Sequence, residues 1–174
     1  DPSSLRYVDE FDPEALTIGF ARRFIPYKRG RLILSDLDRL ISIATKSNQP
    51  IQIYFAGKAH PDDMVSKGII FDVNKKIMEL RSRGVRVKVV FIENYDVRLA
   101  RFLESGVDVW LNNPTRPLEA SGTSGMKAAW NGILNLSTSD GWCEEGVLHG
   151  VNGWLFGVKD GVNDFMDASA LYNR

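Results

Sequence analysis

Short apolar runs alternate with amphipathic stretches along most of the chain. The runs are rich in β-branched residues, which is typical of strands buried on both faces of a parallel sheet. Between them, apolar residues recur every three or four positions, which predicts helices that cover the sheet. The predicted strands span residues 16–20, 51–57, 85–92, 107–111, 133–136 and 154–156.

The predicted helices are bounded by glycine, proline and asparagine. One helix is expected over residues 31–44, after Pro26, which suits a helix entry. The next ends at Gly84, a third spans residues 97–103, and a fourth starts near Thr123. Strands and helices that alternate at this spacing predict a doubly wound, Rossmann-like α/β fold with a parallel sheet. All its strand-to-helix loops lie at one edge, where ligands bind.

The size and composition of the chain fit one domain with a full core. Its 174 residues are 44% hydrophobic and 25% charged. We expect residues 1–15 to be a lead-in, residues 16–157 to form the domain, and residues 158–174 to be a tail that continues into further sequence. Because the first residue is Asp1 rather than methionine, the chain is expected to be a piece of a longer protein.

The charges of the chain balance. It has 22 lysines and arginines against 22 aspartates and glutamates, so neither nucleic acid nor an anionic membrane is an expected partner, and any anion site must be local. One cysteine and two histidines predict neither an intrachain disulfide nor a zinc cluster, which fits a reducing, cytoplasmic location. No apolar run reaches the ~20 residues that a membrane-spanning helix needs.

The strongest chemical signal is the stretch EASGTSGMK, residues 119–127. Two glycines and three hydroxyl residues lead into a short helix, and the free N–H groups of a helix start bind anions. Lys127 lies one turn after Thr123 and on the same face. An anion cradle followed by an amine fits pyridoxal phosphate, which has a phosphate at one end and an aldehyde at the other. A capped surface helix with a solvated lysine would give the same pattern, since one motif is weak evidence.

Further polar residues are expected at the same sheet edge. Arg22, Arg23 and Lys28 follow the first strand, and such cations bind phosphate oxygens. Solvated arginines are common at strand ends, but three cations beside a helix start indicate an anion that compensates them. Tyr95 follows the third strand. It either contacts a cofactor or has a structural role, with its hydroxyl hydrogen-bonded within the domain. Glu119 is able to bind ligand hydroxyls or to be structural.

The tryptophans carry less information. Trp110, Trp130 and Trp154 are expected to pack in the core rather than to bind sugar, because aromatic residues at strand and helix positions usually do so. Trp142 has no clear assignment.

Four motifs in order resemble one protein family. The segments ARRFIPYKR, AGKAHP, FIENY and LEASGTSGMK resemble the carboxyl-terminal domain of glycogen (α-glucan) phosphorylase, nearest the short microbial type, over roughly residues 16–157. The resemblance implies the second of two facing Rossmann-like domains of the retaining glycosyltransferase (GT-B) architecture. It implies phosphorolysis of α-1,4-glucan by inorganic phosphate to glucose 1-phosphate, with the missing amino-terminal domain as the other wall of the cleft. A homo-oligomer is compatible with this assignment.

The same resemblance implies the roles of the site residues. Lys127 would carry pyridoxal phosphate as a Schiff base, and the cofactor's phosphate would exchange a proton with inorganic phosphate. The implied catalytic residues are Arg23, Lys28 and Lys127. The implied cofactor contacts, besides Lys127, are Arg22, Tyr95, Gly122 and Thr123. The implied contacts to glucosyl hydroxyls are Glu119, Ser121 and Gly122.

Departures from the family pattern leave some questions open. Asp96 stands where animal glycogen phosphorylases have an arginine, and RFIPYKR lacks their histidine and glutamate. The side contacts of the cofactor and any allosteric control are therefore not predicted.

Two alternatives to the phosphorylase remain. A nucleotide-sugar-dependent glycosyltransferase similar to glycogen synthase would carry two glutamates eight positions apart. Glu119 fits the first position, but the second is Lys127, which favours pyridoxal phosphate. The other alternative is that the isolated chain is a binding module without activity.

Overall fold

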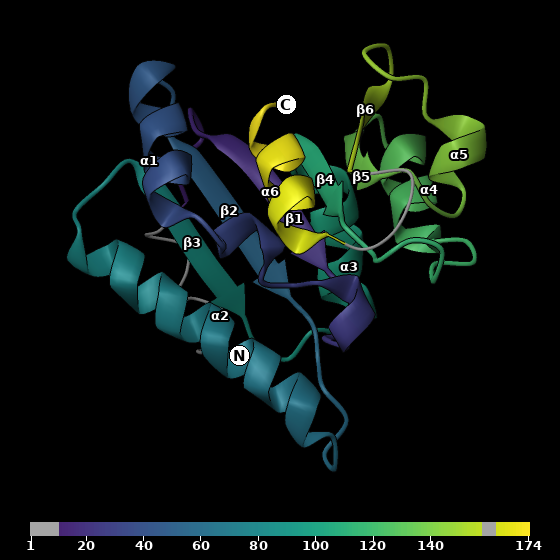
Figure 1. Ribbon diagram of the computed structural model, residues 1–174, viewed down its shortest axis with the longest axis horizontal. Coiled ribbons are helices and arrows are strands. Elements are labelled where there is room, and N and C mark those ends of the chain that lie inside the picture. Colours follow the sequence, from purple (N-terminus) through teal and green to yellow (C-terminus); the bar gives the residue numbers. More distant parts are fainter. Residues whose placement is uncertain (1–10, 158–162) are drawn as a thin grey trace.

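The computed structural model describes residues 11–157 and 163–174, which form an α/β domain (Figure 1). Most of the predicted lead-in and the start of the predicted tail lie outside these ranges. Within them, one parallel sheet has the strand order β3-β2-β1-β4-β5-β6. This is the doubly wound order, so the predicted fold is confirmed. The strands are β1 (Leu16–Ala21), β2 (Ile51–Ala56), β3 (Val87–Ile92), β4 (Val109–Asn112), β5 (Leu134–Thr138) and β6 (Gly153–Phe156).

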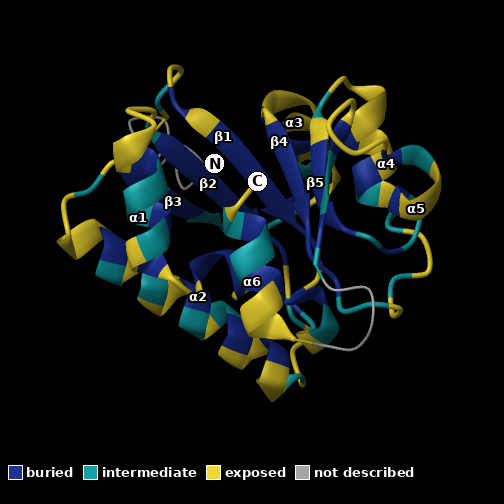
Figure 2. Ribbon diagram, turned by 45° about the horizontal axis from the view of Figure 1, so that its top comes forward, coloured by how far each residue is buried: buried dark blue, intermediate teal, exposed yellow. Residues whose placement is uncertain are grey.

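Helices cover both faces of the sheet (Figures 1 and 2). The larger core lies between the sheet and α1, α2 and α6, whereas a smaller core lies between the sheet and α3 and α4. Among the described helices, none is long and apolar enough to cross a bilayer. The helices are α1 (Leu37–Lys46), α2 (Met64–Ser82), α3 (Val97–Gly106), α4 (Thr123–Trp130), α5 (Cys143–Gly146) and α6 (Asp164–Tyr172), with short 3-10 helices η2 (Pro26–Lys28) and η3 (Leu32–Leu34).

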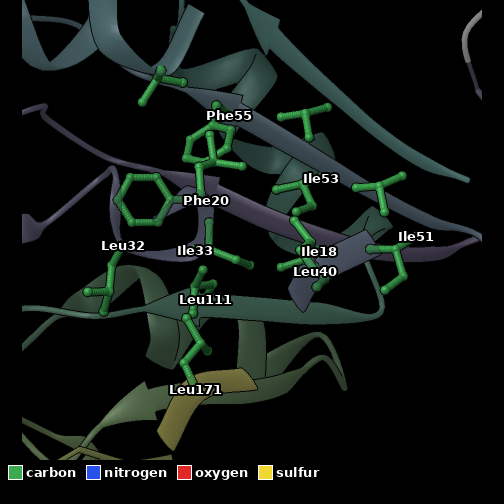
Figure 3. Close-up of a cluster of buried hydrophobic side chains, with 14 of the residues drawn as sticks. Ile18, Phe20, Leu32, Ile33, Leu40, Ile51, Ile53, Phe55, Leu111 and Leu171 are labelled. Atoms are coloured by element: carbon green, nitrogen blue, oxygen red, sulfur yellow. The ribbon is translucent and has the colours of Figure 1, made fainter. Parts of the chain in front are cut away.

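The larger core combines apolar residues of the predicted strands with residues of the helices that cover them. Phe20, Ile53 and Phe55 are fully buried in it, and Figure 3 shows them beside Leu111 and Leu171. Burial of such side chains stabilises the fold by about 1.5–3 kcal/mol each. Residues of α6 thus pack in this core although they lie in the segment predicted as a tail.

The helix predicted over residues 31–44 was wrong in its start. The chain forms η3 and then begins α1 anew at Leu37. Asp36 is the reason, because its carboxylate accepts a hydrogen bond from the backbone N–H of Arg39 at 2.9 Å and so caps α1.

The tryptophans behave differently from one another. Trp110 is fully buried in the smaller core, and Trp154 packs at the edge of the larger one. The prediction for Trp130 was wrong, since 93% of its surface is exposed. In α4 the buried residues are Gly125 and Ala128, and Ala128 packs in the smaller core. Two positions further on, at about 100° per residue, the helix presents Trp130 to solvent.

The sheet has one topological switch point, between β1 and β4. β1 pairs with β2 on one side and with β4 on the other. The chain therefore leaves β1 and β4 in opposite directions, and in folds of this kind the ligand-binding crevice lies at the carboxyl ends of these two strands. Arg22 directly follows β1, and residues 113–122 lead from β4 to α4, so the fold brings the two predicted halves of the site to this crevice.

Candidate functional site

The start of α4 has a glycine N-cap in place of a capping side chain. Its N-cap is Gly122, in the left-handed conformation with φ 82° and ψ 55°, which a residue with a side chain rarely adopts. Among the described residues, no side chain caps this helix. The first-turn N–H groups therefore lack a side-chain acceptor, and they carry the positive end of the helix dipole.

Arg22 is the second element of the site. Its backbone N–H continues the pairing of β1 with β2 by donating to the carbonyl of Ala56 at 3.0 Å, and its side chain is buried. Nη2 donates to Glu119 Oε2 at 2.6 Å, but the buried Nε and Nη1 find no acceptor among the described residues. Burial lowers the pKa of the Arg22 guanidinium, and Glu119 partly offsets this. These two buried nitrogens therefore have hydrogen-bond donors available for a ligand, and an anionic acceptor suits a cation best.

Glu119 balances only part of the positive charge. Its Oε2 also accepts a hydrogen bond from the buried ammonium of Lys28, so one carboxylate faces two cations. The backbone N–H of Glu119 donates to Asp140 Oδ2 at 2.9 Å, which anchors the main chain of Glu119 to the loop after β5. Arg23 adds a further positive charge, with an exposed side chain, at the end of β1. The site therefore carries excess positive charge.

Arg29 fastens the loop that carries Lys28. Its backbone is left-handed with φ 49°, and its buried guanidinium lies 2.5 Å from Asp167 Oδ2 on α6. Nε and Nη2 donate to the carbonyls of Asn113 and Pro114, at 2.8 and 3.0 Å. One side chain thus ties the loops after β1 and β4 to α6, and it holds Lys28 in place.

The amine end of the predicted site lies one turn along α4. Lys127 Nζ is 3.7 Å from Glu104 Oε1, at the end of α3. Burial raises the pKa of the Glu104 carboxyl, and the Lys127 ammonium partly counters this. Tyr95 is half-buried at the smaller core, and burial, together with the charge of Glu104, raises the pKa of its hydroxyl. Lys127, Glu104 and Tyr95 therefore form one electrostatic group.

A polar cluster of Asn112, Asn135 and Trp142 packs against α4 at Gly125. A Cβ atom at Gly125 would lie 2.7 Å from Asn135 Oδ1 and from Trp142 Nε1, and 3.0 Å from Asn112 Nδ2. Asn135 Nδ2 donates to the carbonyl of Gly125 at 3.1 Å. Since only glycine allows this approach, Gly125 sets the depth of the first turn of α4.

Most of the predicted site residues gather at this edge of the sheet. Arg22, Lys28 and Glu119 are in direct contact, and a Cβ at Gly122 would lie 3.5 Å from Glu119 Cγ. Ser121 is exposed, but its carbonyl accepts a hydrogen bond from the backbone N–H of Trp142 at 2.8 Å. Thr123 is the exposed first residue of α4.

Three residues of the site were not predicted from the sequence. Arg29 adjoins Lys28 in the motif but gave no signal of its own. Asp140 follows the predicted strand 133–136, so its position at the ligand-binding edge could have been inferred. Glu104 lies on a helix whose charged residues are mostly exposed, and nothing in the sequence separates it from them.

The residues present fit pyridoxal phosphate. Arg22 offers two buried N–H groups to a phosphate beside the uncapped start of α4, and Lys127 offers an amine one turn later. A metal ion has no comparable site, because the described residues contain no group of three or more histidine, cysteine or acidic side chains able to hold one.

A doubly wound sheet with Arg22 and Lys28 gathered on Glu119 at its switch point places the chain in the Rossmann-like class of α/β domains. Comparison with known proteins narrows this class. The family model for carbohydrate phosphorylases matches residues 7–160, and the chain belongs to that family.

Individual relatives carry names that agree with this family assignment. The chain is 50% identical to a maltodextrin phosphorylase of Thermococcus litoralis over 94% of its length, and 49% identical to a glycogen phosphorylase of Aquifex aeolicus over 99%. It is 48% identical to a glycogen phosphorylase of Mycobacterium tuberculosis over 94% of its length. It spans only 20%, 25% and 19% of these relatives' own lengths, respectively.

Proposed function

We propose that this chain is the cofactor- and phosphate-binding half of an α-glucan phosphorylase. The reaction is phosphorolysis of α-1,4-glucan to glucose 1-phosphate, with pyridoxal phosphate as the cofactor. Family membership and the names of the relatives support the substrate class. The observation that carries the proposal is the buried Arg22 guanidinium, which has two N–H groups without an acceptor beside the uncapped start of α4.

In this proposal Arg22 Nε and Nη1 would hold the phosphate group of the cofactor, together with the N–H groups around Gly122 and Thr123 at the start of α4. Lys127 binds the other end of the cofactor, beside Tyr95. When bound, pyridoxal phosphate supplies a phosphate that exchanges a proton with the substrate phosphate.

The other cations bind and orient the substrate phosphate. Lys28 is buried and shares Glu119 with Arg22, so an anion that approaches it completes the charge balance that Glu119 begins. Arg23 is exposed and is free to approach the same anion. Bringing two phosphates together requires this density of positive charge, because their mutual repulsion would otherwise separate them. Glu119, Ser121 and Gly122 are left to contact glucosyl hydroxyls.

The chemistry at residue 127 argues against the nucleotide-sugar alternative. A synthase-like site would hold the ribose of a nucleotide with a second glutamate, eight positions after Glu119. This chain has Lys127 there, paired with Glu104, and a lysine cannot accept hydrogen bonds from ribose hydroxyls.

This chain supplies one wall of the cleft. The relatives are four to five times longer, as the coverage of 20–25% shows. We infer that an amino-terminal domain forms the opposite wall, so that the 174-residue chain alone binds pyridoxal phosphate weakly and does not cleave glucan.

Product analysis of the full-length protein tests the proposal. Incubation with maltodextrin and inorganic phosphate should release glucose 1-phosphate, and release should stop when pyridoxal phosphate is removed. Glucosyl transfer from a nucleotide-sugar, without dependence on phosphate, would instead identify the synthase-like enzyme. Release of glucose 1-phosphate by the isolated 174-residue chain would contradict the assignment of the second wall.

A further inference from the structure

Glu104 is a buried carboxylate that the proposed reaction does not otherwise use. It lies near the end of α3 and is only 5% exposed, next to Leu103, which packs in the smaller core. A buried carboxylate destabilises a fold unless a partner compensates for its lost hydration. An apolar residue would fill this position at lower cost, so the carboxylate calls for an explanation outside packing.

The partner of Glu104 is Lys127. The carboxylate oxygen Oε1 and the amine Nζ are 3.7 Å apart, on the packed helices α3 and α4. The two side chains differ in exposure, at 7% for Glu104 and 56% for Lys127. The fixed, buried partner therefore holds the mobile, half-exposed one, since a long lysine side chain otherwise samples many rotamers. Tyr95 is the other titratable group that faces Glu104.

We propose that Glu104 is a positioning residue for Lys127. Its carboxylate attracts the amine from the protein side of α4, so that an aldehyde ligand whose phosphate is bound at the start of the helix meets the amine in one orientation. The identity of that ligand rests on the proposed function, whereas the contact between Glu104 and Lys127 does not.

The reactivity of Lys127 in the cofactor-free, full-length protein tests this role. Limiting acetic anhydride, followed by peptide mass mapping, gives the acetylation rate of each lysine. In Glu104→Gln, Lys127 should be acetylated about threefold faster, as expected for the loss of one partly exposed ion pair. The exposed Lys67 and Lys75 should not change and serve as internal references. Glu14→Gln removes the same charge from an exposed position before β1 and should change none of the three rates.

An unchanged acetylation rate of Lys127 in Glu104→Gln would overturn the proposal. Lys127→Met gives an independent test, since it leaves Glu104 buried without its cation. This variant should be less stable than the wild type at neutral pH, and equal stability would also contradict the proposal.

Uptake of pyridoxal phosphate separates this inference from the proposed function. We expect Glu104→Gln to take up the cofactor several-fold more slowly, followed by the absorbance of the bound cofactor. Faster acetylation of Lys127 in a protein that takes up no cofactor would support the positioning role and contradict the proposed function. If Glu104→Gln leaves the acetylation rate of Lys127 unchanged and the protein does take up pyridoxal phosphate, the positioning role would be contradicted and the proposed function supported.

Discussion

Arg22 Nη2 donates a hydrogen bond of 2.6 Å to Glu119 Oε2, across 97 positions of the chain. This contact joins the loop after β1 to the loop after β4, at the switch point of the sheet. Because Lys28 shares the same carboxylate oxygen, Glu119 faces two cations at once. These charges lie at the place where doubly wound folds bind their ligands, as the proposed function requires.

Replacing Glu119 should make the stability of the domain depend on added anions. Glu119→Gln leaves Arg22 and Lys28 without a counter-charge, and we expect the free energy of unfolding to fall by about 2–3 kcal/mol. Inorganic phosphate should recover part of this loss by binding the folded state. Thermal unfolding in phosphate and in chloride of equal ionic strength measures the effect. Glu145→Gln, at an exposed position, is the control. An equal response to both salts would contradict the anion site.

Arg29 should not tolerate replacement by lysine. Arg29→Lys keeps the charge but loses the planar fork that reaches Asp167 and the carbonyls of Asn113 and Pro114. We expect a loss of about 3 kcal/mol in the free energy of unfolding, since buried acceptors lose their donors. Arg31→Lys is the matched control, because Arg31 pairs with Asp72 at the surface, and its effect should stay within about 0.5 kcal/mol. Urea unfolding measures both free energies. Equal losses of stability for Arg29→Lys and Arg31→Lys would contradict the view that the Arg29 side chain ties the two loops to α6.

Two glycine-to-alanine substitutions should change the free energy of unfolding in opposite directions. In Gly125→Ala the new methyl group would collide with Asn135 and Trp142, and we expect a loss of about 1–3 kcal/mol. Gly68→Ala places its methyl group in open space on α2, where lower chain entropy of the unfolded state should stabilise the protein by about 0.4–1 kcal/mol. Urea unfolding measures both. If Gly125→Ala did not change the stability, contact with Asn135 and Trp142 would not limit how closely α4 approaches the sheet.

Glu104 should make the protein less stable as the pH rises. Burial raises the pKa of its carboxyl in the folded state. Between the unfolded-state pKa and this raised value the folded state binds more protons, so the Glu104 contribution to stability is present at lower pH and is lost as pH rises through the folded-state pKa. Glu104→Gln does not titrate, and the variant should gain stability relative to the wild type from acidic to neutral pH. A relative gain by the wild type would contradict this sign.

The fold could be predicted because its signals are local. The apolar β-branched runs end within one or two residues of the observed strands, and the alternation with helices leads to a parallel sheet. The loops of the site followed from this topology, since parallel strands send their carboxyl ends to one edge. This topology predicts that Arg22, Lys28 and Glu119 lie together, and the contacts of Glu119 with both cations confirm that they do.

Features that depend on tertiary packing were missed. Glu104 is one of several charged residues on α3, and only the approach of α4 makes it buried. The exposure of Trp130 depends on which side of a short helix meets the sheet, and Ala128 determines that side. The break between η3 and α1 depends on whether the Asp36 side chain turns inward as a cap, which an apolar pattern does not record.

Lys127 is the residue on which the proposed cofactor depends, and reductive trapping tests it most directly. The full-length protein is incubated with pyridoxal phosphate, reduced with borohydride, digested and mapped by mass spectrometry. Our account predicts a pyridoxyl group on Lys127 and none on the exposed Lys67. An active, full-length enzyme without this modification on Lys127 would contradict it.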